Sequence, residues 1–283
     1  MGYIYWIASY PKSGNTWIRS FLHHLVSYPA SANINDLQSF APDEANGIAY
    51  DRFLTKSGPE RTLRDYAAVR PQVQAGIASL VPGFVFVKTH HRLGIHLGTP
   101  TINMAVTAGA IYVVRNPLDV VVSYSEFLQT GIDAAIDTMQ ESGYMFAGMK
   151  NGPYQVCGSW NENVSSWTDK QHDRLHVVRY EDMLDMPFET FSGITRFLQL
   201  DAADEQISGA IEGASFRQLQ AQEAQLGFQE RPNVTKKFFR VGEKDQWRTR
   251  LSREQIERIV DANGPLMQRF GYFEDAVEFL NRI

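Results

Sequence analysis

The chain has 283 residues, of which 43% are hydrophobic and 21% are charged, as in an ordinary globular protein that can bury a substantial core. The formal net charge of −5 argues against general nucleic-acid binding, although it allows a local basic pocket for one anionic nucleotide. The single cysteine, Cys157, excludes an internal disulfide and fits a reducing compartment.

No segment has the features of a membrane anchor or a leader. The N-terminal apolar run is too short for a signal peptide, and no basic region precedes it. No apolar stretch approaches the roughly 20 residues that are needed to span a bilayer. We therefore expect a cytoplasmic protein with neither nucleic acid nor membrane as a partner. The sequence does not fix the oligomeric state.

Short apolar runs alternate with helical patterns along the chain. The runs that we interpret as buried parallel strands are residues 3–8, 84–88, 110–115 and 175–179. Helical patterns follow at residues 16–26, 117–128 and 187–198. This alternation predicts an α/β fold, in which a central parallel sheet is flanked by helices in a single domain spanning 1–283.

Three segments have weaker periodicity and are predicted to be variable loops and short helices that cover a site: residues 29–80, 129–155 and 217–238. Near the C-terminus, residues 253–270 are predicted to form a helix. Ser252 and Gln255 stand at capping-box spacing before it, and Gly271 is a plausible stop.

The segment 9–17, S-Y-P-K-S-G-N-T-W, lies between the first predicted strand and the first predicted helix. A tight loop before a helix N-terminus binds anions, because its N–H groups converge and the helix dipole adds positive potential. The spacing nearly fits a nucleotide-triphosphate P-loop, with Gly14 and Thr16 at matching positions. However, Asn15 occupies the lysine position, and the lysine is displaced to Lys12. This P-loop-like loop therefore predicts a bound phosphate whose reacting group is not an ATP γ-phosphoryl.

The displaced-lysine loop resembles the 5′-phosphosulfate loop of the sulfotransferases that use 3′-phosphoadenosine 5′-phosphosulfate (PAPS). Further segments are similar to that family in the family's order: K-T-H at 88–90, Y-V-V-R-N-P-L-D-V-V-V-S-Y at 112–124, Y-E-D-M at 180–183, and R-V-G at 240–242 followed by Trp247. These matches run from residue 9 to about 247. The segments 10–17 and 158–167 also resemble bacterial sulfotransferases that modify glycopeptide natural products.

The resemblance implies a catalytic group of four residues. His90 would be the general base, and its unperturbed pKa suits proton abstraction near neutrality. Lys12 would stabilise the charge that develops on the departing 5′-phosphate. Lys88 would contact the transferring sulfuryl oxygens, and Ser123 would bind the 3′-phosphate and restrain Lys12. His91 is the adjacent alternative base, and its replacement by alanine is expected to be mild.

The same resemblance implies the residues that hold the cofactor: Lys12, Ser13, Gly14, Asn15, Thr16, Trp17, Arg115, Ser123, Tyr180, Phe216, Arg240, Val241 and Gly242. Among these, Trp17, Tyr180 and Phe216 would contact the adenine, because aromatic faces stack on a purine. Arg115 and Arg240 would bind the 3′-phosphate.

This chain departs from the family pattern in its C-terminal segment. Val241 stands where the family has a lysine, so that one phosphate-binding charge is missing, and Asp245-Gln246 replaces the usual G-D. The nearby charges that could compensate are Lys236, Lys237 and Lys244.

The sequence thus predicts a sulfotransferase that uses PAPS, releases 3′-phosphoadenosine 5′-phosphate (PAP) and requires no metal. The expected partner is a small-molecule hydroxyl acceptor, either a phenol, an alcohol or a natural-product scaffold. Two other readings stay open at this point: a P-loop small-molecule kinase and a non-catalytic nucleotide-binding module.

Overall fold

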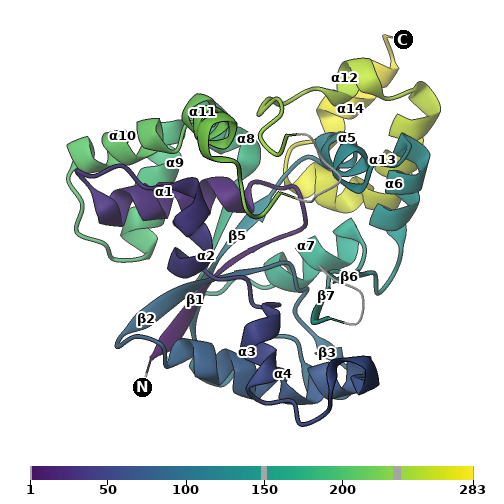
Figure 1. The fold of residues 1–283 in the computed structure, drawn as a ribbon. Helices are drawn as coiled ribbons and strands as arrows, with labels where there is room; N and C mark the ends of the chain where they lie inside the picture. The colour runs from purple at the N-terminus through teal and green to yellow at the C-terminus, as the bar shows by residue number, and fades with distance from the viewer. Residues whose placement is uncertain (1, 148–151, 232–236, 283) are drawn as a thin grey trace. The chain divides into compact units, whose positions relative to one another are not determined.

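The computed structural model describes residues 2–147, 152–231 and 237–282 (Figure 1). The chain divides into two compact units, each built from three segments. The first unit comprises Met1–Tyr10, Ala41–Tyr112 and Met139–Val177. The second unit comprises Pro11–Phe40, Val113–Thr138 and Val178–Ile283. A single domain over residues 1–283 stays a prediction.

A four-stranded sheet forms the centre of the fold, in the order β2-β1-β5-β8. The strands are β1 (Tyr3–Ser9), β2 (Phe84–Thr89), β5 (Thr107–Val114) and β8 (Leu175–Arg179). β1 and β2 are parallel, and Tyr3 lies opposite Phe84. Ile4, Trp6 and Ile111 are completely buried, which explains why their strands are continuous apolar runs. The predicted α/β class and parallel sheet are confirmed.

The third strand differs slightly from its predicted range of residues 110–115. It begins earlier, and Arg115 lies beyond its end. The reason is local, since the side chain of Asn116 accepts a hydrogen bond from the backbone N–H of Leu118 and so caps the next helix. Pro117 then occupies the first helical position, where its missing N–H costs nothing.

The first unit contains further short elements. They are the helices α3 (Gly47–Asp51), α4 (Leu63–Ala78) and α7 (Trp160–Thr168), the 3₁₀ turns η2 (Gly58–Glu60) and η3 (Met104–Val106), and the antiparallel pairs β3 (Ile95–His96) with β4 (Thr99–Pro100) and β6 (Met145–Ala147) with β7 (Tyr154–Val156). Helix α4 packs on β1 and β2.

Helix α4 is longer than the short helices expected within residues 29–80, since it has 16 residues. It begins with a capping box formed by Thr62 and Asp65. Its buried face includes the polar residues Arg70 and Gln74, and Pro71 lies inside it. These three residues obscure the apolar periodicity, so the sequence pattern did not reveal the helix.

The second unit is mainly helical. Its elements are α1 (Asn15–Ser27), η1 (Ile34–Asp36), α2 (Leu37–Phe40), α5 (Pro117–Leu128), α8 (Tyr180–Asp185), α9 (Pro187–Phe197), α10 (Asp204–Gly213), α11 (Phe216–Leu226), α12 (Trp247–Arg250), α13 (Arg253–Arg269) and α14 (Phe273–Leu280), and α6 (Ile132–Gln140) leads out of it. Helix α1 lies alongside α10, and α13 packs on α5 and α14 (Figure 1). The predicted capping box of Ser252 and Gln255 is confirmed.

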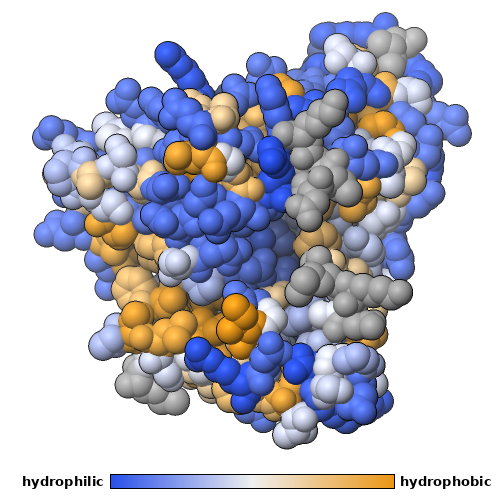
Figure 2. Space-filling model, in the orientation of Figure 1, coloured by the Kyte–Doolittle hydropathy of each residue, from blue (hydrophilic) through white to orange (hydrophobic). Residues whose placement is uncertain are grey.

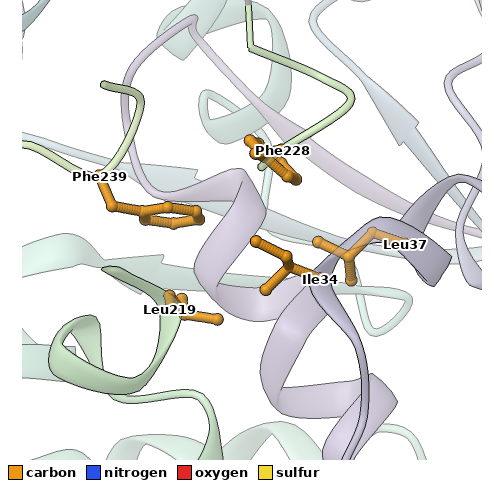
Figure 3. Close-up of a cluster of buried hydrophobic side chains, with 5 residues drawn as sticks. All are labelled: Ile34, Leu37, Leu219, Phe228 and Phe239. Carbon is orange, nitrogen blue, oxygen red and sulfur yellow. The ribbon is translucent and has the colours of Figure 1, made fainter. Parts of the chain in front are cut away.

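A cluster of buried apolar side chains in the second unit joins segments that are distant in sequence. Figure 3 shows its members pointing toward one another: Ile34, Leu37, Leu219, Phe228 and Phe239. The cluster fixes Phe239 against α2 and α11. It therefore also positions the segment that follows, which begins with Arg240.

Apolar side chains also reach the surface of the first unit, where Figure 2 shows them gathered in the region of β2 and α3. A hollow here is lined by Ile48 and Phe53 on one side and by Val73, Ile77 and Leu80 on the other.

Of the helices in the described ranges, none is long and apolar enough to cross a membrane.

Asn163 of α7 connects three parts of the first unit and provides a test of its stability. The buried amide donates to the carbonyl oxygens of His90 at 3.0 Å and Cys157 at 2.8 Å, and it accepts a hydrogen bond from the Tyr112 hydroxyl at 2.8 Å. Each buried group left unpaired costs about 1–3 kcal/mol, so Asn163→Leu should lower the free energy of unfolding by about 3 kcal/mol. Urea denaturation measures this, with the exposed Asn281→Leu as the control; equal midpoints for the two variants would count against the network.

Candidate functional site

The loop that joins β1 to α1, residues 10–14, is named the phosphate loop after its predicted ligand and has the backbone geometry of an anion site. Lys12 and Gly14 adopt left-handed conformations, with φ of 67° and 108°. Gly14 caps α1, and its carbonyl oxygen accepts hydrogen bonds from the N–H groups of the following turn. The N–H groups of a first helical turn lack intrahelical partners and, with the helix dipole, attract an anion. The structure places Asn15 and Thr16 in that turn.

Two observations describe the packing of the loop and a polar atom that a ligand could satisfy. A Cβ atom at position 14 would lie 2.7 Å from Cδ2 of Tyr180, so only glycine fits there. Ser13 is buried, and among the described residues its hydroxyl has no hydrogen-bond partner. A buried polar atom without a partner is costly, and a bound anion would satisfy it.

The ammonium of Lys12 lies between two aromatic rings of the second unit. It is 4.7 Å from the ring centre of Phe127 on α5 and 4.4 Å from that of Phe238. Cation–π attraction of this kind is worth about 0.5–2 kcal/mol and orients the side chain. The displaced lysine is therefore held in place by groups that add no counter-charge.

Arg115 connects the phosphate loop to the C-terminal segment. Its guanidinium donates to the carbonyl oxygen of Lys12 at 3.1 Å and to that of Glu243 at 3.0 Å. It also lies over the ring of Tyr180, at 4.2 Å from the ring centre. The Nε atom is buried and has no partner among the described residues. Neither carbonyl cancels the positive charge, which can therefore act on a bound anion.

Tyr180 is positioned by its neighbour in the Y-E-D-M element. The Glu181 carboxylate accepts hydrogen bonds from the backbone N–H of Asn116 at 3.0 Å and from the Tyr272 hydroxyl at 2.8 Å. Burial raises the pKa of this carboxyl group, and those two hydrogen bonds oppose the shift. Glu181 thus fixes the start of α8 beside the Arg115 turn.

The aromatic residues predicted to contact adenine have two different placements. Trp17 and Tyr180 lie edge to face, with ring centres 5.7 Å apart. Phe216, at the start of α11, packs against Gly242, where a Cβ atom would lie 2.2 Å from the phenyl ring. Gly242 has φ of 71°, so both the conformation and the space require glycine.

One face of α5 organises the C-terminal part of the site. The Asp119 carboxylate accepts hydrogen bonds from the backbone N–H groups of Asp245 at 2.7 Å and Trp247 at 3.2 Å. Burial raises the pKa of Asp119. Ser123 and Phe127 follow Asp119 at successive i+4 positions, so they share its face of the helix. The Asp245-Gln246 departure thus keeps a backbone contact with α5.

The charges expected to compensate for Val241 have different outcomes. Lys236 lies outside the described residues. Lys237 is exposed, and Lys244 forms an ion pair with Asp185. Arg240 forms an ion pair with Glu126, which also binds Arg250. This carboxylate was not foreseen from the sequence, although its place three residues after Ser123 could have indicated it.

His90 follows β2 in the first unit, and its surroundings define its tautomer. Its Nδ1 atom lies 2.8 Å from the carbonyl oxygen of Ser9 and 3.3 Å from the Ser9 hydroxyl. A carbonyl oxygen only accepts hydrogen bonds, so Nδ1 carries the proton. The basic nitrogen of the neutral ring is therefore Nε2. The backbone N–H of His90 donates to Gln155 at 3.1 Å, which fixes the position of the residue.

Lys88 has a counter-ion that the sequence analysis missed. Its ammonium donates to the Asp43 carboxylate at 2.8 Å, and the same carboxylate accepts a hydrogen bond from Gln155 at 2.9 Å. Burial alone would raise the pKa of Asp43, but Lys88, with smaller contributions from His90 and the backbone N–H of Ala45, outweighs it and the pKa lies below its usual value. Asp43 was missed because it belongs to a segment that the sequence analysis interpreted as a covering loop.

His91 is fully buried in a polar cluster, so its replacement would affect stability, while a mild effect on turnover stays a prediction. Its Nδ1 accepts from the backbone N–H of Val156 at 2.9 Å, so Nε2 carries the proton and donates to Glu44 at 3.2 Å. Burial lowers the pKa of His91, against the opposing effect of the Glu44 carboxylate. A neutral ring that is occupied on both nitrogens is structural.

The structure thus assembles the predicted residues in two groups. His90 and Lys88 belong to the first unit. The second unit contains residues 11–14 of the phosphate loop, Arg115, Ser123, Tyr180 and the segment 240–242.

Among the described residues, no group of three or more His, Cys, Asp or Glu side chains could hold a metal ion.

The sequence matches the family model described as a sulfotransferase domain, over residues 5–271. The chain belongs to the sulfotransferase family. It is 27% identical over 263 residues to mouse sulfotransferase 1 family member D1, covering 89% of this chain and 79% of that protein. It is 25% identical over 276 residues to cytosolic sulfotransferase 6 of Arabidopsis thaliana, covering 89% of this chain and 75% of that protein. The predicted family is confirmed.

Solved sulfotransferase-family structures share the fold. Mouse sulfotransferase SULT7A1, complexed with PAP, superposes with a TM-score of 0.65 at 17% identity, covering 99% of this chain and 89% of that one. Retinol dehydratase, in complex with androsterone and inactive cofactor PAP, superposes with a TM-score of 0.62 at 19% identity, covering 92% of this chain and 80% of that one. These similarities establish the fold of this sulfotransferase, while the roles of its individual site residues stay predictions.

The buried His91 gives this sulfotransferase a predicted pH dependence of stability. Because the folded-state pKa lies below 6.5, the unfolded chain binds a proton that the folded chain does not. Stability should be full above about pH 6.5 and fall as the pH drops below it, by at most about 1.4 kcal/mol per pH unit for this group. The pKa of Glu44 is lowered as well, which adds a loss of the same sign at more acidic pH. Two further charged groups, Arg70 and Asp43, also act on the pKa of His91, which Arg70 lowers and Asp43 raises.

Urea denaturation between pH 5 and 8 tests this dependence. The slope of unfolding free energy against pH should be smaller in His91→Gln, which keeps a donor toward Glu44. The exposed His172→Gln is the matched control and should retain the slope. An unchanged slope in His91→Gln would show that His91 does not cause the acid sensitivity.

Proposed function

We propose that this sulfotransferase transfers a sulfuryl group from PAPS to a hydroxyl group of a small-molecule acceptor. The observation that carries the proposal is the pair of cations on the phosphate loop. Lys12 is displaced from the P-loop position, and Arg115 binds the carbonyl oxygen of that same residue. A nucleotide with phosphate groups at both its 5′ and 3′ ends needs two fixed cations of this kind. The SULT7A1 and retinol dehydratase structures, which contain PAP, support the choice of nucleotide.

The local geometry fits this nucleotide. The Ser13 hydroxyl and the Arg115 Nε are buried donors without partners among the described residues. At Gly14 and Gly242 a Cβ atom would meet the rings of Tyr180 and Phe216, so glycine lets these two aromatic side chains pack directly on the loop backbone. Trp17, Tyr180 and Phe216 would provide aromatic surface for the purine.

PAPS would supply the sulfuryl group, and the residues of the chain would manage charge and protons. Nε2 of His90 would accept the proton of the attacking hydroxyl, since Nδ1–H is directed to Ser9. The Lys12 ammonium would stabilise the electron pair that remains on the departing 5′-phosphate oxygen. Asp43 would keep Lys88 in place, and Ser123 would bind the 3′-phosphate.

The acceptor would be a phenol, an alcohol or a hydroxylated natural-product scaffold. The ring of Phe146 lies edge-on to His90, with ring centres 6.4 Å apart, which would suit an apolar or aromatic alcohol. The androsterone in the retinol dehydratase complex is an apolar alcohol of this class. The segments 29–80, 129–155 and 217–238 are proposed to shape the acceptor side, and residues 1–283 to act as one sulfotransferase domain.

The cofactor assignment predicts metal-independent nucleotide binding. Isothermal titration calorimetry in the presence of a chelator should show PAP binding with a Kd of about 1 μM, a free energy near −8 kcal/mol, or tighter. ATP with Mg²⁺ should bind more weakly than PAP. Binding of Mg²⁺–ATP without binding of PAP would instead support a small-molecule kinase. Binding of PAP without turnover on any phenol, alkyl alcohol or glycosylated acceptor would support a non-catalytic binding module.

The base assignment predicts a separation between turnover and cofactor affinity. His90→Ala should lower kcat by roughly 10²–10⁴-fold and leave the PAP affinity unchanged, because a positioned base acts on the acceptor proton. Lys12→Ala should lower kcat and also weaken PAP binding, since its ammonium would contact the 5′-phosphate before and after transfer. The exposed His172→Ala is the control. Full activity of His90→Ala would exclude it as the base.

A further inference from the structure

Glu126 of α5 is a carboxylate shared between two arginines of the C-terminal segment. It forms an ion pair with Nε of Arg240, and its other oxygen accepts a hydrogen bond from Arg250 at 3.0 Å. Ser123 lies one turn earlier on α5, so its hydroxyl and the Glu126 carboxylate belong to the same part of the helix surface. Two guanidinium groups thus converge on one anion beside Ser123.

The charge at this place is unbalanced. Two arginines carry two positive charges and Glu126 carries one negative charge, so one positive charge remains. Arg240 also donates a hydrogen bond to the neutral amide of Gln246, at 3.4 Å. A phosphate monoester carries a charge of about −1.5 to −2 near pH 7 and has three acceptor oxygens, so it would balance the two arginines better than a carboxylate does.

The ion pairs of Glu126 with Arg240 and Arg250 are partly exposed to solvent, and separating them costs little free energy. The exposed fractions of the side chains are 34% for Arg240, 28% for Glu126 and 45% for Arg250. Ion pairs with this exposure contribute only about 0–1 kcal/mol, because water screens them. A doubly charged ligand could therefore replace Glu126 at little cost.

Arg250 is held in position by its own short helix. Helix α12 packs on α5, and its first residue, Trp247, is completely buried with its ring 4.9 Å from that of Phe279. The backbone N–H of Trp247 donates to Asp119 on the same α5 helix that carries Glu126. The backbone that carries Arg250 is thus fixed on α5. Val241 stands where the family pattern has a lysine, so Arg250 could supply the positive charge that this lysine would have provided.

We propose that Arg250 is an additional ligand for the 3′-phosphate of the nucleotide and that Glu126 occupies that phosphate position when the nucleotide is absent. This inference rests on the proposed function, because it assigns Arg240 to the 3′-phosphate. Binding exchanges the Glu126 carboxylate for the phosphate, and Glu126 then turns to solvent. The exchange makes the site selective for nucleotides that carry a 3′-phosphate, since other nucleotides leave the Glu126 ion pairs intact.

The test compares PAP with adenosine 5′-monophosphate, which lacks the 3′-phosphate, by calorimetry. Arg250→Ala should weaken PAP binding by about 10-fold or more, the effect of one lost charge-assisted hydrogen bond, and leave adenosine 5′-monophosphate unchanged. Glu126→Gln should strengthen PAP binding about 2- to 5-fold, because it removes the competing charge of an exposed pair, again without effect on the monophosphate. Arg250→Lys should retain part of the preference for PAP.

Arg258→Ala is the matched control. Arg258 is a partly exposed arginine of the second unit that is ion-paired with Asp133 and Asp137, and its replacement should leave both affinities unchanged. Thermal unfolding of each unliganded variant reports whether it is folded.

The outcomes separate this inference from the proposed function. If the unmodified protein binds PAP and neither Arg250→Ala nor Glu126→Gln changes the ratio of the two affinities, the inference is wrong and the proposed function stands. Equal losses for PAP and the monophosphate would assign Arg250 a purely structural role and would also overturn the inference. If the unmodified protein does not bind PAP, the proposed function fails and the inference fails with it.

Discussion

The Arg115 guanidinium is the contact on which the second unit's site depends. It bridges two backbone carbonyl oxygens, that of Lys12 in the phosphate loop and that of Glu243 in the C-terminal segment. These positions are 231 residues apart in the sequence. Loss of the Arg115 guanidinium would remove one hydrogen bond from each of the two carbonyl groups. Because the partners are neutral, the bridge organises the site without neutralising it. The same group can therefore shape the loop and attract a phosphate.

The acids around the site are distributed in a way that suits this design. Asp119 and Glu181 accept hydrogen bonds from backbone N–H groups, so they fix main-chain segments. Glu126 is different, since it is paired directly with arginines. In the first unit Asp43 is paired with Lys88 in the same direct way. The carboxylates that accept hydrogen bonds from backbone N–H groups fix the shape of the site. The carboxylates that pair with lysine or arginine side chains reduce its net positive charge.

The two adjacent histidines show how local contacts decide chemistry. At His90 a backbone carbonyl oxygen occupies Nδ1 and leaves Nε2 as the basic atom. At His91 a backbone N–H occupies Nδ1, and the proton on Nε2 is directed to a buried carboxylate. The rings are identical, and the difference lies in whether a donor or an acceptor faces Nδ1. One residue is therefore suited to proton transfer and the other to structure.

The sequence by itself determined the sulfotransferase family, the α/β class and the parallel strands, because continuous apolar runs, glycine positions and motif spacing are local properties. It also predicted the tight turn before α1, since that turn depends on residues that are adjacent in the chain. It did not reveal α4, because the buried Arg70 and Gln74 interrupt its apolar pattern. Only the tertiary structure identified Asp43 as the partner of Lys88, Glu126 as the partner of Arg240 and Arg250, and the tautomers of His90 and His91. Each of these contacts joins groups that are far apart in the sequence. It depends on which group the fold brings to face a given atom, and residue type alone does not specify that.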